Sequence, residues 1–78
     1  MQEEEIKQQL MSTNPEFRRL VKEHHQFEGR LQELQSHHLL SEKDLIEEAT
    51  LKKKKLHLKD EMNALIRNFR NEMSHQHS

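Results

Sequence analysis

The chain has 78 residues, of which 31% are hydrophobic and 35% are charged, and its formal net charge is −1. This length suits one small domain, and the near-neutral charge gives no general attraction to nucleic acid or to an anionic membrane. The chain has no cysteine, which excludes disulfides, thiolate metal sites and thiol catalysis. The lack of tryptophan and tyrosine and the single glycine disfavour a β-sheet, so the choice lies between a coiled-coil-like helical chain and a disordered one.

The first half of the chain repeats large residues at alternating steps of four and three. With Glu, Lys, Arg and Gln between them, this heptad spacing predicts an amphipathic helix over about residues 2–36. The positions are Ile6, Leu10, Thr13, Phe17, Leu20, His24, Phe27, Leu31 and Leu34.

One break interrupts this helix at residues 12–15. Asn14 before Pro15 indicates an N-cap followed by proline at the first helical position, and Thr13 with Glu16 fits a capping box shifted by one residue. Because the heptad keeps its phase through the break, we expect residues 2–12 to form a short helix that continues the same line after a kink. A frayed N-terminal arm is the alternative.

The only plausible turn lies at residues 36–41, and a second helix follows over about residues 42–73. Ser41 with Asp44 resembles a capping box, which marks the start of that helix. We expect the polar tail, residues 74–78, to fray. The predicted apolar seam of the second helix consists of Leu51, Leu58, Met62, Leu65, Phe69 and Met73.

A turn near residues 39–40 brings the two apolar seams opposite each other. The predicted pairs are Leu20 with Leu58, Phe17 with Met62, Leu10 with Phe69, Ile6 with Met73, Phe27 with Leu51, and Leu34 with Leu45. One layer is polar, because His24 falls opposite Lys55. We therefore predict an all-α fold, a two-helix antiparallel coiled-coil hairpin with its first helix kinked or broken near Pro15, forming one domain over residues 1–78.

A second apolar stripe on the later helix does not fit a lone hairpin. At about 100° per residue, Leu45, Ala49 and Leu56 lie roughly 140° from the Leu51 to Met73 seam, with Ile46 near them. Either the helices twist so that these residues cover the turn end, or they form a second contact face. A two-helix hairpin buries each helix on one side only, so association would add stability.

Other motifs give weaker signals. The seven histidines lack the shared helical face and the inward carboxylate of a metal site, so we predict no metal ligand and no cofactor. Residues 52–55 are four consecutive lysines that spread around a helix, with no aromatic residue nearby to stack on bases. No nucleophile with an organised base and no phosphate-binding glycine loop is recognisable, so we predict no catalytic residue and no enzyme.

Three stretches resemble the YdcH-like family, short bacterial proteins of unknown function. They are NPEFRRL at residues 14–20, EHH at residues 23–25 and LKKKKLHLKDEM at residues 51–62, and the resemblance covers about residues 12–70. It implies a bacterial, cytosolic helical hairpin and carries over no catalytic residue, cofactor or named partner. It also favours a binding role for the lysine segment.

The leading hypothesis is a protein–protein interaction or adaptor module, which binds itself as a dimer or binds an unidentified larger protein. The candidate partner-binding residues are Leu45, Ala49, Lys52, Lys53, Lys54 and Leu56. The alternative is a nucleic-acid-associated protein that uses Lys52 to Lys55, although the charge makes this partner less favoured. The opening residues are acidic and no apolar run could span a bilayer, so we expect a cytoplasmic protein with no membrane partner.

Overall fold

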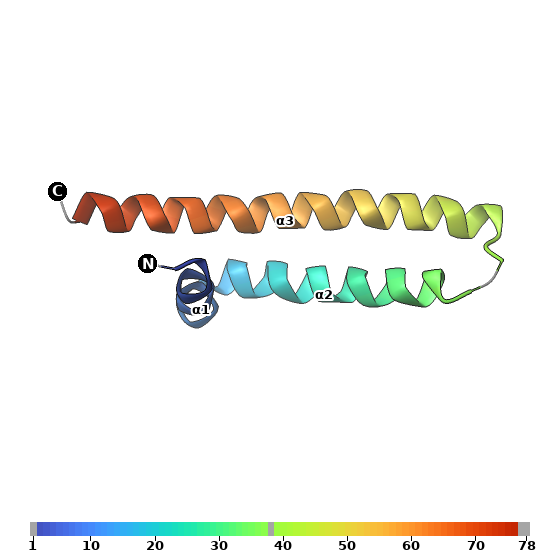
Figure 1. The fold of residues 1–78 in the computed structure, drawn as a ribbon, viewed down its shortest axis with the longest axis horizontal. Helices are drawn as coiled ribbons and strands as arrows, with labels where there is room; N and C mark the ends of the chain where they lie inside the picture. The colour runs from blue at the N-terminus through green and yellow to red at the C-terminus, as the bar shows by residue number, and fades with distance from the viewer. Residues whose placement is uncertain (1, 38, 77–78) are drawn as a thin grey trace.

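The chain folds into three helices in the computed structural model, which describes residues 2–37 and 39–76. They are α1 (Glu3–Thr13), α2 (Pro15–Gln35) and α3 (Glu42–Gln76). Helices α2 and α3 run antiparallel side by side, and α1 lies at the open end of this hairpin (Figure 1). No strand is present among the described residues. The all-α class is therefore confirmed, whereas the chain has three helices rather than the two predicted.

The separation of α1 from α2 results from the conformation of Asn14. Its backbone is extended, with φ −117° and ψ 105°, as expected before proline, whose ring disfavours the α region at the preceding residue. Figure 1 views α1 end-on while α2 runs across the picture, so α1 turns sharply away from the α2 axis. The expectation that the first helix continues the same line was wrong.

The local hydrogen bonds at this break distinguish the two capping predictions. The Asn14 Oδ1 accepts a hydrogen bond from the Phe17 backbone N–H at 3.0 Å, so the predicted N-cap is confirmed. The Thr13 hydroxyl donates instead to the Gln9 carbonyl of α1 at 2.7 Å, so the shifted capping box with Glu16 was wrong. Thr13, which the heptad placed in the seam, is exposed.

Two apolar clusters hold the helices together. Near the turn, Leu31, Leu34 and Leu51 are buried, with Phe27 packed against them. At the open end, all three helices contribute to a cluster in which Ile6 is 1% exposed. The buried members of this second cluster are Ile6, Leu10, Phe17 and Ile66, and Val21, Met62, Leu65 and Phe69 pack against them.

Three of the predicted pairs lie in common clusters: Phe17 with Met62 and Leu10 with Phe69 at the open end, and Phe27 with Leu51 near the turn. The predicted pairs Ile6 with Met73 and Leu34 with Leu45 do not, because α1 turns away and α3 is rotated at the turn end. Leu34 is buried, but Leu45 is 53% exposed, so these two residues do not form the expected layer. A helix turns about 100° per residue, which places Leu45 about 120° around α3 from the buried Leu51. Ile66, which we had not assigned to the seam, is 5% exposed and belongs to the core.

An ion pair joins α2 and α3 near the turn, on the side of α3 that faces α2. The Arg30 guanidinium donates two hydrogen bonds of 2.9 Å, from Nε and from Nη2, to the two carboxylate oxygens of Glu47. The hydrogen bonds from Arg30 outweigh the effect of desolvation and hold the pKa of Glu47 below its ordinary value. The same hydrogen bonds raise the pKa of Arg30. It fixes the rotation of α3 relative to α2 near the turn.

The start of α3 agrees with the prediction and its end does not. The Ser41 hydroxyl accepts from the Asp44 N–H at 3.1 Å, and the Asp44 carboxylate accepts from the Ser41 N–H at 3.3 Å, which is the predicted capping box. The helix continues to Gln76, three residues into the tail that we expected to fray, and residues 77–78 lie outside the described part of the chain.

Candidate functional site

Four residues of α3 form an exposed stripe along the edge of its contact with α2. They are Leu45, Ala49, Lys52 and Leu56, hereafter the α3 stripe, and their spacing of four, three and four residues aligns them along one side of the helix. Leu45 is 53% exposed and Leu56 is 59% exposed. Ala49 is exposed as well. Leucines that are more than half exposed on one helix face form an apolar surface that a partner can bury.

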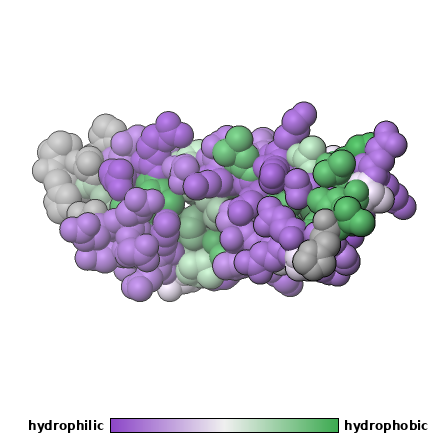
Figure 2. All heavy atoms as spheres, turned by 45° about the vertical axis from the view of Figure 1, so that its right-hand side comes forward, coloured by the Kyte–Doolittle hydropathy of each residue, from purple (hydrophilic) through white to green (hydrophobic). Residues whose placement is uncertain are grey.

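Two further large apolar side chains are exposed near the turn, outside the α3 stripe. Ile46 is 62% exposed and Leu39 is 91% exposed. Figure 2 shows hydrophobic atoms gathered at this end of the molecule, whereas most of the visible surface is hydrophilic. Of the two alternatives for the stripe, covering the turn end is not what the structure shows, because Leu45 and Leu56 remain open to solvent.

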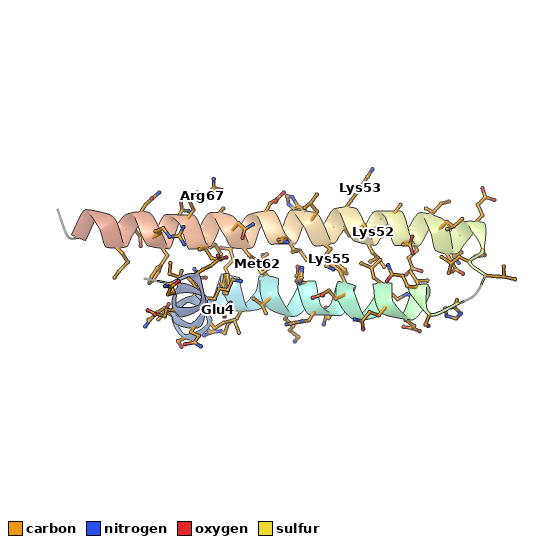
Figure 3. All side chains as sticks on the ribbon, in the orientation of Figure 1. Glu4, Lys52, Lys53, Lys55, Met62 and Arg67 are labelled. Carbon is orange, nitrogen blue, oxygen red and sulfur yellow. The ribbon has the colours of Figure 1, made fainter. Side chains whose placement is uncertain are left out.

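The four consecutive lysines do not act as one surface. Lys52 pairs with Glu48 at 3.5 Å, as expected for a carboxylate four residues earlier. Lys55 is half-buried and pairs with Glu28 of α2 at 3.7 Å. Figure 3 shows Lys53 pointing away from α2 while Lys55 lies between the helices. The sequence-predicted set is therefore divided, and Lys52 alone among the lysines belongs to the α3 stripe.

Lys53 and Lys54 line a different, shallow groove. Its volume is about 440 Å³, and the remaining lining residues are Glu23, Phe27, His57 and Leu58. Lys53 and Lys54 are both exposed. We had grouped these lysines with the apolar stripe, but the helical turn carries their side chains around toward another side of the hairpin.

A polar cluster between α2 and α3 corresponds to the predicted layer of His24 and Lys55. Glu28 bridges it, because its Oε1 lies 3.0 Å from His24 Nδ1 and its Oε2 lies 3.7 Å from Lys55 Nζ. His25 Nδ1 is also 3.7 Å from Glu28 Oε1. We missed Glu28, although its spacing of four residues from His24 on one helix could have indicated the contact.

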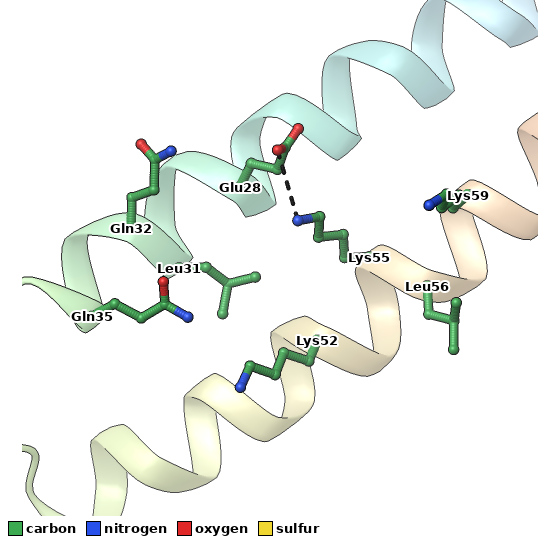
Figure 4. A pocket seen from close by; sticks show the side chains of 8 residues that line it. All are labelled: Glu28, Leu31, Gln32, Gln35, Lys52, Lys55, Leu56 and Lys59. Carbon is green, nitrogen blue, oxygen red and sulfur yellow. Dashed lines mark ion pairs between the residues drawn. The ribbon is translucent and has the colours of Figure 1, made fainter.

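A groove between α2 and α3 lies next to this cluster (Figure 4). It has a volume of about 390 Å³. Leu31 contributes apolar surface, and the surrounding polar groups are ammonium and amide groups together with one carboxylate. Such groups suit the binding of acidic or amide side chains from a partner. The lining residues are Glu28, Leu31, Gln32, Gln35, Lys52, Lys55, Leu56 and Lys59.

The histidines do not assemble a metal centre in the described part of the chain. No group of three or more His, Asp or Glu side chains lies close enough there to hold a metal ion. The rings of His24 and His25 are 6.3 Å apart between centroids and tilted by 74°. His38 and His77 lie outside the described residues.

The family model of DUF465, described as "Protein of unknown function", matches residues 17–66. This match covers more than half of the chain, and the chain belongs to this family. The match lies within the stretch that resembles the YdcH-like family and is compatible with that resemblance. No curated protein and no solved structure matches the chain. Within residues 2–37 and 39–76, no helix has the length and apolar character needed to cross a membrane.

Proposed function

We propose that this member of the DUF465 family is a protein–protein interaction or adaptor module without catalytic activity, which docks through the α3 stripe and acts in the bacterial cytoplasm. The observation that carries the proposal is the exposure of Leu45 and Leu56, 53% and 59%, on a stripe about 120° around α3 from the buried seam.

Each helix of this chain buries only part of its surface. Over most of its length the molecule is a pair of helices, α2 and α3, each covered on one side by the other, and it extends only 19 Å and 17 Å across. Full burial of a leucine side chain contributes about 1.5–3 kcal/mol. Docking of the stripe against another helix would therefore add to stability as well as to recognition.

The charges around the stripe suit a helical partner with acidic residues. Lys52 lies between the two leucines, and its ammonium is already close to Glu48. Lys59 lines the neighbouring groove. Charges at the edge of an interface increase the association rate and select the partner more than they increase affinity.

The test compares two leucine substitutions of equal chemistry. Leu56→Glu places a charge in the α3 stripe, whereas Leu39→Glu makes the same change at an exposed leucine outside α3. We expect Leu56→Glu to abolish both self-association in sedimentation and capture of specific proteins from bacterial lysate, with unchanged helicity. Leu39→Glu should leave both intact. Equal association and capture by the wild type and Leu56→Glu would refute a role for the stripe.

Nucleic-acid binding is the competing proposal, and the same capture experiment separates the two. The lysine segment supports it only in part, because Lys52 and Lys55 each lie beside a glutamate. Nucleic-acid binding would weaken steeply with salt, and the captured material would disappear after nuclease treatment. The interaction module predicts that the captured proteins persist after nuclease and vanish with Leu56→Glu.

A further inference from the structure

The α3 stripe has a spacing that reads the same in both chain directions. The steps between Leu45, Ala49, Lys52 and Leu56 are four, three and four residues. If a second α3 runs antiparallel across the stripe, Leu45 meets Leu56 of the second copy, and Ala49 meets Lys52 of the second copy. Each contact then occurs twice, as a two-fold interface requires. In antiparallel coiled coils, successive layers pair in this reciprocal way.

The charges that flank the stripe match the same register. Glu42 lies three residues before Leu45, and Lys59 lies three residues after Leu56. Both are exposed, and neither forms an ion pair within the described residues. The antiparallel register brings Glu42 beside Lys59 of the second copy at both ends, whereas a parallel register would place like charges together. The charges therefore select one orientation.

The centre of the interface can accommodate Lys52 while its ammonium group keeps an ion-pair partner. Ala49 is small, so the aliphatic stem of Lys52 from the second copy can lie across it. Each Lys52 ammonium keeps its own partner, because Glu48 of the same helix is 3.5 Å away. Loss of such a partner would add to the desolvation cost of burying the charge.

The geometry of the hairpin leaves this face open to a second copy. Leu56 projects from the side of α3 that faces away from α2 in Figure 4, and the stripe lies about 120° from the buried seam. A contact from Glu42 to Lys59 would be about 26 Å long at 1.5 Å per residue. Two α3 helices can meet along that length, beside the groove that Lys52, Leu56 and Lys59 line together with α2.

We infer that the α3 stripe docks against the α3 stripe of a second copy, antiparallel about a two-fold axis, with Leu45 against Leu56 and Glu42 against Lys59. The inference rests on the proposed function and names its partner. Because the interface contains four leucines over a short helical contact, the dimer belongs at the weak end of specific interfaces and forms with rising protein concentration.

A charge-exchange experiment tests this register. Glu42→Lys and Lys59→Glu each place like charges together at both ends of the dimer. Sedimentation equilibrium at low salt, over a concentration series from low micromolar to millimolar, should show each single variant dimerising roughly tenfold more weakly than the wild type. An equimolar mixture of the two variants restores opposite charges at both contacts. We expect it to recover the association of the wild type as a heterodimer.

The mixture also excludes an effect on folding alone, because a variant that merely destabilised α3 would not be rescued by the other. A dimer that is insensitive to both single variants, or an unrescued mixture, would overturn the inference. So would a wild type that stays monomeric throughout the series. In that last case, loss of protein capture by Leu56→Glu but not by Leu39→Glu would still support the proposed function with a different partner.

Discussion

Truncation of Ile6 tests whether α1 is held by the core of the hairpin or unfolds independently. Ile6 is 1% exposed and belongs to the cluster with Leu10, Phe17 and Ile66. Ile6→Ala removes three carbon atoms, equivalent to about 2.4 kcal/mol of transfer free energy, and a residual cavity raises the total to about 2–5 kcal/mol. The other buried residue of α1, Leu10, contributes about 1.5–3 kcal/mol. The free energy lost in Ile6→Ala is thus comparable to the burial energy of Leu10, the other residue that docks α1.

We therefore expect Ile6→Ala to release α1 while α2 and α3 stay paired. A helix of 11 residues is too short to persist alone in water. Released, α1 would remove about a sixth of the helical circular dichroism signal, given 21 residues in α2 and 35 in α3. Hydrogen exchange should show lost protection in α1 and retained protection around Leu20 and Leu58.

The control is Leu20→Ala, which truncates a residue that is also 1% exposed but lies in the hairpin itself. It should lower the urea midpoint of the whole protein, with a loss of about 2–5 kcal/mol in the free energy of unfolding. If Ile6→Ala lowers that midpoint equally and leaves α1 protected until global unfolding, α1 is an integral part of one cooperative unit. The reasoning about independent docking would then be wrong.

Two further predictions concern the caps and the ion pair between the helices. Asn14→Ala removes the acceptor of the Phe17 N–H and should lower the free energy of unfolding by about 0.5–2 kcal/mol in urea titrations, while Asn14→Ser should retain most of it; equal loss in both variants would contradict the capping role. The pKa of Glu47 is lowered in the folded state by the hydrogen bonds from Arg30, so its stabilisation is present above the unfolded pKa and is lost as pH falls through the folded one. The difference in urea midpoint between the wild type and Glu47→Gln should therefore be present at neutral pH and shrink on acidification, and a difference independent of pH would count against the ion pair.

The helical fold was accessible from sequence because its signals are local. The heptad from Ile6 to Leu34 identified the apolar face of the first half, and the Asn14 and Ser41 caps marked where two helices begin. Each signal involves residues within one turn of a helix, where spacing alone determines which side chains are neighbours. The same reasoning placed Phe17 and Met62 in one cluster, as the structure has them.

The direction of α1 and the role of Ile66 depend on contacts that local spacing does not encode. The heptad phase continues from Leu10 to Phe17, so the sequence suggested a straight continuation. Because Asn14 before the proline is extended, the apolar spacing continues along the sequence although the two helices point in different directions. When α1 turns across the open end, it covers a side of α3 that α2 does not reach. Ile66 is buried there in a cluster with Ile6 and Leu10 of α1 and Phe17 of α2.

The early part of α3 carries two apolar stripes, and this explains both the misassigned layer and the candidate surface. Leu45 and Leu56 follow one helical stripe, and Leu51 and Leu58 follow another about 120° away. The spacing of apolar residues does not by itself select which stripe faces α2.

The ion pair and the core of α2 make that selection together. A rotation of α3 that buried Leu45 and Leu56 would expose Leu51, which packs with Leu31 and Leu34, and would withdraw Glu47 from Arg30. The hairpin therefore cannot bury both stripes at once. Leu45 and Leu56 stay exposed because the apolar face of α2 already packs against the stripe that contains Leu51. The partner that we propose, a second helix of the same sequence, complements the stripe in reverse through its spacing and its flanking charges.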